Sequence, residues 1–114
     1  MNGITTHVLD TSRGRPAVDL GVTLERIERG GVSTELGRGR TDSDGRARSL
    51  LPEGADAGPG RYRLRFDTGA WFAEQGVLGF YPQVTVEFEL GEAGRHCHVP
   101  LLLSPYGYST YRGT

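Results

Sequence analysis

The 114-residue sequence has one cysteine, no lysine and no long apolar run. A single cysteine, Cys97, excludes an internal disulfide and is typical of a protein in a reducing cytosol. The absence of lysine excludes catalysis through a lysine Schiff base and a phosphate-binding loop that depends on lysine. A membrane-spanning helix needs about 18 consecutive apolar residues, and the sequence contains no such run.

The sequence also lacks an excess of charge. Its 13 basic residues, all arginine, are set against 14 acidic residues, which gives a net charge of -1. Nucleic-acid-binding proteins normally carry a basic excess. The first residues, MNGITTH, contain neither the basic nor the apolar stretch of a signal peptide. We therefore expect no nucleic acid or membrane as partner, and a cytoplasmic location.

The length predicts one domain over residues 1–114, because single cores usually occupy about 100–200 residues. Only 36% of the residues are apolar, which is little for an isolated monomer, so burial against other copies of the chain is expected. The 18 glycines fall between short β-like runs rather than in one tract. They predict tight turns rather than disorder.

Alternation of apolar and polar residues predicts antiparallel strands. In residues 61–67 the apolar side chains point one way and the arginines the other, and residues 84–90 repeat the pattern with glutamates. The two polar faces predict cross-strand arginine–glutamate pairs. Further strands are predicted at 5–10, 18–28, 32–41, 98–103 and 106–112, with a short helix within 68–76. Seven or eight strands of this kind indicate an all-β sandwich of two small sheets.

The run 98–103, HVPLLL, is apolar on both faces of a strand. A strand of this kind must be covered on both sides. One side belongs to the core of the sandwich, so we expect the other to be a subunit interface.

Histidines mark two of these strands. Alternation places His96 and His98 on one face and Cys97 on the other, where it packs in the core. A His-x-His pair on a strand is a recurrent metal motif, to which His7 would add a third ligand. The alternative is that these are ordinary polar residues of a strand or loop.

If the first strand pairs with the last two, His7, His98, Ser109 and Tyr111 converge on one surface. Two histidines in a largely apolar cleft formed at an interface are a reasonable general acid/base system near neutral pH. No G-x-S-x-G nucleophile motif accompanies Ser109, which argues against covalent serine catalysis.

Two arginines follow the Asp44–Gly45 turn on one face of the chain. A guanidinium suits planar, oxygen-rich anions because it donates two parallel hydrogen bonds. We expect Arg46 to point into the cleft, and we interpret Arg48 as a solvated strand residue.

Three segments resemble one known family. They are HVLD at 7–10, TDSDGR at 41–46 and HVPLLLSPYGYSTYRGT at 98–114. In this order they resemble the transthyretin-like 5-hydroxyisourate hydrolases, enzymes of urate degradation. Hormone-carrying transthyretins share LLSPY but have neither histidine and do not end in YRGS.

The resemblance implies a transthyretin-like sandwich of two four-stranded sheets with one short helix, assembled as a homotetramer (a dimer of dimers). Its active sites would lie in a channel between dimers. The implied reaction is hydrolysis of 5-hydroxyisourate to 2-oxo-4-hydroxy-4-carboxy-5-ureidoimidazoline, with no metal and no organic cofactor.

Motif by motif, the resemblance implies that His7, Arg46 and His98 are catalytic. The two histidines would activate a water molecule, and Arg46 would hold the substrate's oxygens. The expected substrate-binding residues are Tyr111 and Leu102 as walls of the flat ring, with Ser109 and Thr114 as polar edges. Thr114 departs from the family's usual terminal serine: it keeps the hydroxyl and adds a methyl group.

Two alternatives stay open. The first is a transthyretin-like carrier that binds a small molecule without catalysis. The second is a metal-dependent hydrolase that uses His7, His96 and His98.

Overall fold

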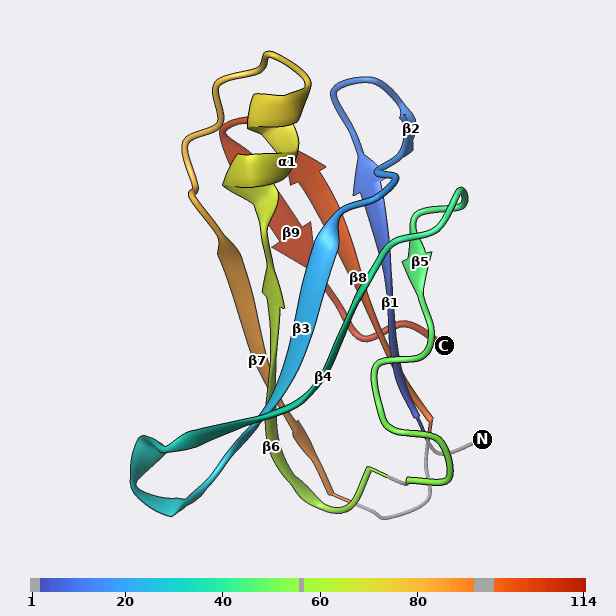
Figure 1. Ribbon diagram of the computed structural model, residues 1–114, viewed down its shortest axis with the longest axis vertical. Coiled ribbons are helices and arrows are strands. Elements are labelled where there is room, and N and C mark those ends of the chain that lie inside the picture. The colour runs from blue at the N-terminus through green and yellow to red at the C-terminus, as the bar shows by residue number, and fades with distance from the viewer. Residues whose placement is uncertain (1–2, 56, 92–95) are drawn as a thin grey trace.

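Two β-sheets packed face to face form the protein (Figure 1). The computed structural model describes residues 3–55, 57–91 and 96–114. Sheet A consists of β1 (Ile4–Asp10), β2 (Arg15–Pro16), β5 (Arg46–Ala47), β8 (Cys97–Ser104) and β9 (Gly107–Thr110). Sheet B consists of β3 (Gly21–Ile27), β4 (Ser33–Arg40), β6 (Gly60–Phe66) and β7 (Val84–Leu90). The predicted all-β sandwich is confirmed.

Sheet A has the order β2-β1-β8-β9 and sheet B the order β4-β3-β6-β7. The sequence-based expectation of two four-stranded sheets omits β5, which pairs with β1 as a fifth member of sheet A. Both β2 and β5 have two residues and pair with different parts of β1, at Leu9–Asp10 and at Thr6–His7 respectively. They share one edge of β1, so sheet A remains four strands wide.

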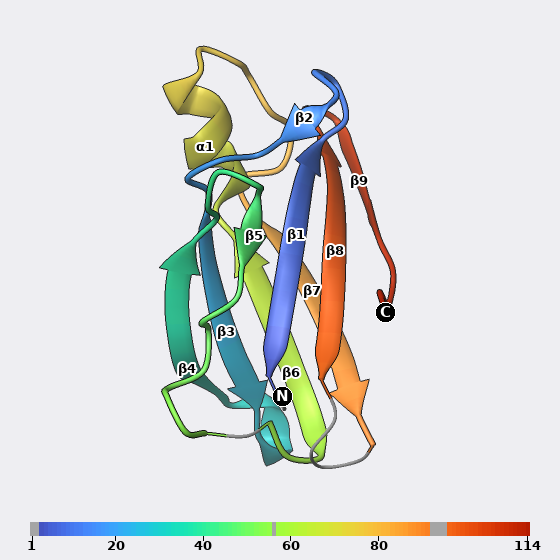
Figure 2. The ribbon, with the colours of Figure 1, turned by 90° about the vertical axis from the view of Figure 1, so that its right-hand side faces the viewer.

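The first and last long strands of the chain are neighbours. Strand β1 runs parallel to β8, with Thr5 opposite His98 and His7 opposite Pro100. Strand β9 then pairs antiparallel with β8 on the other side. Figure 2 looks onto sheet A and shows β5, β1, β8 and β9 side by side. This pairing is the one on which the predicted convergence of residues depends.

The core lies between the sheets and follows the period-2 alternation of the strands. Its largest fully buried side chains are Tyr62, Phe66, Ile4, Leu20, Leu24, Leu50, Leu64, Leu101, Leu103, Val8, Val22 and Val84. Cys97 points into this core and is 3% exposed, as predicted. Burial raises the pKa of its thiol, which keeps the sulfur protonated and unreactive.

Short helical segments connect the strands of sheet B. The 3-10 turn η1 (Arg29–Gly31) joins β3 to β4, and positive φ angles at Gly30 and Gly31 allow it. Helix α1 (Thr68–Glu74) joins β6 to β7 and lies within the predicted helical segment. Its Trp71 indole donates a 2.8 Å hydrogen bond to the Val18 carbonyl. Among the described residues, no helix is long and apolar enough to span a membrane.

Ion pairs cover the outer face of sheet B. Arg61 lies 3.8 Å from Glu87 and 3.9 Å from Glu89, as the polar faces of β6 and β7 predict. Arg63 and Arg65 instead pair with Glu25, at 2.8 and 2.9 Å. The reason is topological, because β3 lies on the other side of β6 and places Glu25 opposite Arg63.

Candidate active site

A pocket of about 630 Å³ opens on the outer face of sheet A. It is bordered by β1, by β5 with the residues after it, by the start of β8, and by the C-terminal segment. The lining residues are Thr5, Thr6, His7, Leu9, Arg46, Arg48, Ser49, His96, His98, Pro100, Tyr111, Arg112, Gly113 and Thr114. The pocket therefore combines segments from both ends of the chain.

A tight turn delivers Arg46 to this pocket. The Asp42 carboxylate accepts hydrogen bonds from the backbone N–H groups of Arg46 (3.0 Å) and Asp44 (2.9 Å). The Arg46 N–H bond, and then the Asp44 one, lowers the pKa of Asp42. Gly45 has φ +79°, and a Cβ there would lie 2.5 Å from the Val8 carbonyl oxygen. The turn therefore requires glycine, as the DSDG motif predicts.

His7 is held beside Arg46 by the pairing of β1 with β5. The two residues are directly opposite in this antiparallel pair, so their side chains share a face. Nε2 of His7 lies 2.8 Å from the Asp44 carbonyl oxygen. Because a carbonyl only accepts hydrogen bonds, Nε2 must carry the hydrogen. Nδ1 of the neutral ring therefore keeps a lone pair and is able to act as a base.

His98 is held from the side of β1 as well. Its Nδ1 lies 2.8 Å from the hydroxyl of Thr5, which also lies 3.1 Å from Nε2 of His96. Burial lowers the pKa of His98, and the charges of Arg46, His7 and His96 lower it further. The lowered pKa favours the neutral form of His98, the form in which a histidine can accept a proton.

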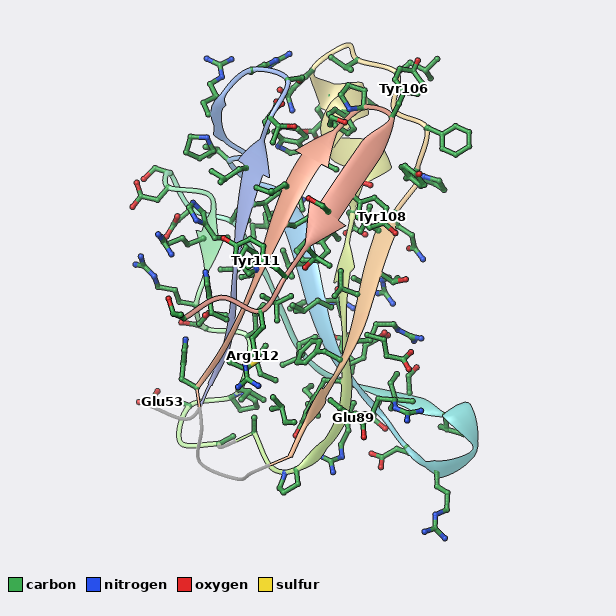
Figure 3. All side chains as sticks on the ribbon, turned by 180° about the vertical axis from the view of Figure 1, so that it is seen from behind. Glu53, Glu89, Tyr106, Tyr108, Tyr111 and Arg112 are labelled. Carbon is green, nitrogen blue, oxygen red and sulfur yellow. The ribbon has the colours of Figure 1, made fainter. Side chains whose placement is uncertain are left out.

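The C-terminal segment closes one side of the pocket. Figure 3 shows this segment leaving β9, with Tyr111 on its path. Gly113 forms a bridge with His98, and its N–H donates to the His98 carbonyl at 2.8 Å. A Cβ on Gly113 would lie 2.6 Å from Cδ2 of His98. Glycine is thus what lets the segment lie against the histidine ring.

Most of the predicted site residues come together, namely His7, Arg46, His98, Tyr111 and Thr114. Leu102 and Ser109 do not line the pocket. They pair with each other on β8 and β9, and Leu102 is four residues beyond His98. At about 3.3 Å per residue this is roughly 13 Å along the strand. Alternation places Leu102 and Ser109 on the outer face of sheet A, the face on which the pocket opens. Their contact with substrate stays a prediction.

The structure adds pocket residues that the sequence reasoning did not assign. Arg48, interpreted as a solvated residue, lines the pocket together with Arg46. Thr5 lies two residues before His7 on the same face, a signal that alternation already contained. Arg112 joins them from the C-terminal segment, whose position beside the start of β8 has no signature in the local pattern.

The electrostatic character of the pocket is cationic. Its described lining residues include three arginines and three histidines but no aspartate or glutamate. This lining favours an oxygen-rich, anionic or strongly polarised ligand. Among the described residues, no three histidine, cysteine, aspartate or glutamate side chains are arranged to hold a metal ion. One nitrogen of each ring is already engaged in a hydrogen bond, His7 with the Asp44 carbonyl and His96 and His98 with the Thr5 hydroxyl.

Comparisons with known proteins point to one family. The model of a family described as the HIUase/Transthyretin family matches residues 4–113. The 5-hydroxyisourate hydrolase of Salmonella dublin is 47% identical over 113 residues, which cover 99% of this chain and 82% of that protein. The 5-hydroxyisourate hydrolase of Caulobacter vibrioides is 46% identical over 119 residues, with both chains covered fully.

Solved structures extend the comparison to the fold. The 5-hydroxyisourate hydrolase of Klebsiella pneumoniae superposes with a TM-score of 0.86 at 38% identity, with 100% of both chains covered. Transthyretin from Sparus aurata superposes with a TM-score of 0.90 at 30% identity and covers 99% of this chain and 97% of its own. Overall shape therefore does not separate hydrolase from carrier, whereas sequence identity favours the hydrolases. The chain belongs to the HIUase/Transthyretin family.

Proposed function

We propose that the protein is a hydrolase that converts 5-hydroxyisourate to 2-oxo-4-hydroxy-4-carboxy-5-ureidoimidazoline in urate degradation. The observation that carries this proposal is the placement of His7, Arg46 and His98 on one cationic pocket. Support comes from the full-length similarity to proteins named 5-hydroxyisourate hydrolase. A hydrolase needs a base for water and a group that stabilises an oxyanion, and this pocket offers both.

The proposed chemistry begins with water activation. A neutral histidine, His98 or His7, takes a proton from a water molecule whose oxygen attacks a carbonyl carbon of the six-membered ring. Arg46 donates hydrogen bonds to the oxygen that becomes negative. The ring C–N bond then breaks, and the proton returns from the histidine to the leaving nitrogen. General-base assistance is commonly worth about 10²–10⁴ in rate, and oxyanion stabilisation about as much.

Substrate contacts complete the proposal. Tyr111 is an aromatic wall for the flat ring, and Thr114 is a polar edge; both line the pocket. Leu102 and Ser109 continue the same face of sheet A beyond the pocket, where they extend the wall in the assembled protein.

We also propose that each copy of the chain forms one domain over residues 1–114 and that copies assemble as a homotetramer, a dimer of dimers. The tetramer is supported by the low apolar content of the sequence and by the large apolar side chains that are exposed on the single chain. These are Val18, Val32, Leu78, Phe80, Tyr106, Tyr108 and Tyr111. Native mass spectrometry tests the assembly: a protein that stays monomeric at micromolar concentration contradicts it.

A transthyretin-like carrier is the second candidate, because the fold superposes equally well on a transthyretin. The two histidines and Arg46 distinguish the candidates, since a carrier needs a channel but no base. A carrier would bind a flat ligand and leave it unchanged.

The deciding experiment follows the ultraviolet absorbance of 5-hydroxyisourate generated in place from urate. The substrate decays spontaneously, so each trace is compared with a blank without the protein. We expect the protein to accelerate the decay, and an unchanged decay rate would contradict the proposal. A second arm repeats the assay after exhaustive chelation: unchanged activity is expected, and its loss would favour a metal-dependent hydrolase.

A further inference from the structure

A hydroxyl group lies between two histidine rings on the outer face of sheet A. Thr5 Oγ1 is 2.8 Å from Nδ1 of His98 and 3.1 Å from Nε2 of His96. Thr5 is only 8% exposed, His98 is half-buried and His96 is exposed. The three side chains therefore connect the pocket to water through a buried hydroxyl.

The number of hydrogens limits how this chain of bonds is arranged. A threonine hydroxyl donates one hydrogen bond and also accepts. In one arrangement Nδ1 of His98 donates to Thr5, and Thr5 donates to Nε2 of His96. In the other, both bonds run in the opposite direction. The first leaves Nε2 of His98 with a lone pair, whereas the second requires a hydrogen on that nitrogen.

We propose that Thr5 is a positioning residue and that Thr5 and His96 form a proton relay between His98 and solvent. This inference rests on the hydrolytic function proposed above. When Nε2 of His98 takes a proton from water, the Nδ1 proton passes to Thr5 Oγ1 and the hydroxyl proton passes to Nε2 of His96. His98 ends neutral, Thr5 keeps one hydrogen, and His96 carries the positive charge. The reverse transfer returns a proton for the leaving nitrogen.

The charges around His98 explain why such a relay is useful. The half-buried ring is faced by His7 from β1, Arg46 from β5 and His96, while Arg48 and Arg112 also line the pocket. Burial and the charges of Arg46, His7 and His96 lower the pKa of His98, so an imidazolium there is disfavoured. His96 is exposed to water, which solvates its charge. The relay moves the positive charge from the half-buried ring of His98 to the exposed ring of His96.

In the described part of the chain, His7 is not hydrogen-bonded to a group that could pass its proton on to solvent. Its Nε2 donates to the backbone carbonyl of Asp44, which has no hydrogen to pass on. The two histidines are therefore not equivalent: only His98 is bonded to a group that both donates and accepts.

The first test compares two substitutions of Thr5. Thr5→Val keeps the β-branched shape suited to a strand and removes the hydroxyl, whereas Thr5→Ser keeps the hydroxyl. We expect kcat to fall about tenfold or more in Thr5→Val with KM changed less than about threefold, and Thr5→Ser to keep most of the activity. Thr11→Val is the matched control, because the Thr11 hydroxyl donates to the Leu103 carbonyl outside the pocket. Equal kcat in the two Thr5 variants overturns the proposal.

The second test removes the outer member of the relay. We expect His96→Ala to lose about tenfold in kcat in dilute buffer and to regain activity as imidazole is added, because the free base replaces the missing ring. The unsubstituted protein should not respond to imidazole. A His96→Ala variant with unchanged kcat in dilute buffer overturns the relay.

A third measurement does not depend on activity. Nitrogen-15 NMR of the histidine rings reports which nitrogen of His98 carries the hydrogen. We expect His96→Ala and Thr5→Val each to change this balance, and no change in either variant overturns the proposal. Failure of the unsubstituted protein to accelerate 5-hydroxyisourate decay contradicts the proposed function instead, so the two failures are distinguishable.

Discussion

The outer faces of the two sheets are both rich in arginine, but they use it differently. On sheet B, Arg63 and Arg65 clamp one glutamate, Glu25, whose side chain is 9% exposed. On sheet A, Arg46 and Arg48 take part in no ion pair among the described residues and line a pocket that holds histidines instead. Paired arginines hold strands together, whereas unpaired ones beside neutral bases remain available to a ligand. The two groups of arginines therefore differ in whether an acidic side chain pairs with them, and this difference decides which of them can bind a ligand.

The largest effect is expected at the histidines of sheet A. His7→Asn and His98→Asn should each lower kcat by at least about 100-fold, because each removes a proposed base. The fold should survive, since both side chains lie on the outer face. The ultraviolet decay assay measures the loss, and circular dichroism checks the fold. Full activity in either variant would show that this ring is not a required base.

Arg46 follows in expected effect. Arg46→Gln should lower kcat/KM by about 100-fold, because a charged donor to the developing oxyanion is lost. Arg61→Gln on sheet B is the matched control: Arg61 pairs only at the surface with Glu87 and Glu89, so activity should not change. Similar losses in both variants would erase the distinction between the two faces.

Gly113→Ala tests the contact between the C-terminal segment and His98. The added Cβ would lie 2.6 Å from Cδ2 of His98, so the ring or the segment has to move. We expect kcat to fall about tenfold, because small displacements of a catalytic group are costly. Gly107→Ala is the control, since its Cβ would meet the Ser104 hydroxyl at an ordinary 3.6 Å. Equal kcat for the two variants would argue that the contact does not position His98.

Glu25→Gln tests whether the ion pairs of sheet B support stability rather than activity. Two part-buried charge-assisted hydrogen bonds are weakened, so the free energy of unfolding should fall by roughly 1–3 kcal/mol. The activity of the folded protein should be unchanged. Chemical denaturation and the decay assay measure the two quantities separately. A large loss of activity at full folding would show that the ion pairs of sheet B also serve the site.

The smallest effect is expected in the pH dependence. The proposed mechanism needs neutral His98, whose pKa lies below its ordinary 6.5, so kcat/KM should fall only as the pH drops below that value. In the same window the unfolded chain binds more protons than the folded one, so stability also decreases as the pH falls. A pH series corrected by the blank at each pH measures the first, and thermal melts measure the second. A midpoint above 6.5 would contradict the lowered pKa.

Much of this architecture is present in the sequence because period-2 alternation assigns each strand residue to a face. It assigns Cys97 to the core face, and it assigns His7 and His98 to one outer face once β1 is taken to pair with β8. It does not say how far along a face two residues lie, which is why Leu102 and Ser109 were predicted at a pocket that they do not line. It also does not name the neighbouring strand, so the pairing of Glu25 with arginines of β6 could not be derived. The double hydrogen bond of Thr5 requires side-chain geometry that no local pattern carries.

The parallel pairing of β1 with β8 has a consequence for folding. All strands of sheet B lie within residues 21–90, whereas sheet A joins residues as far apart as Thr5 and His98. Contacts between such distant residues close a long loop and are slow to form. A chain in which only sheet B has formed would have its arginine–glutamate pairs but no pocket. The proposed active site therefore forms only when the two ends of the chain have paired in sheet A.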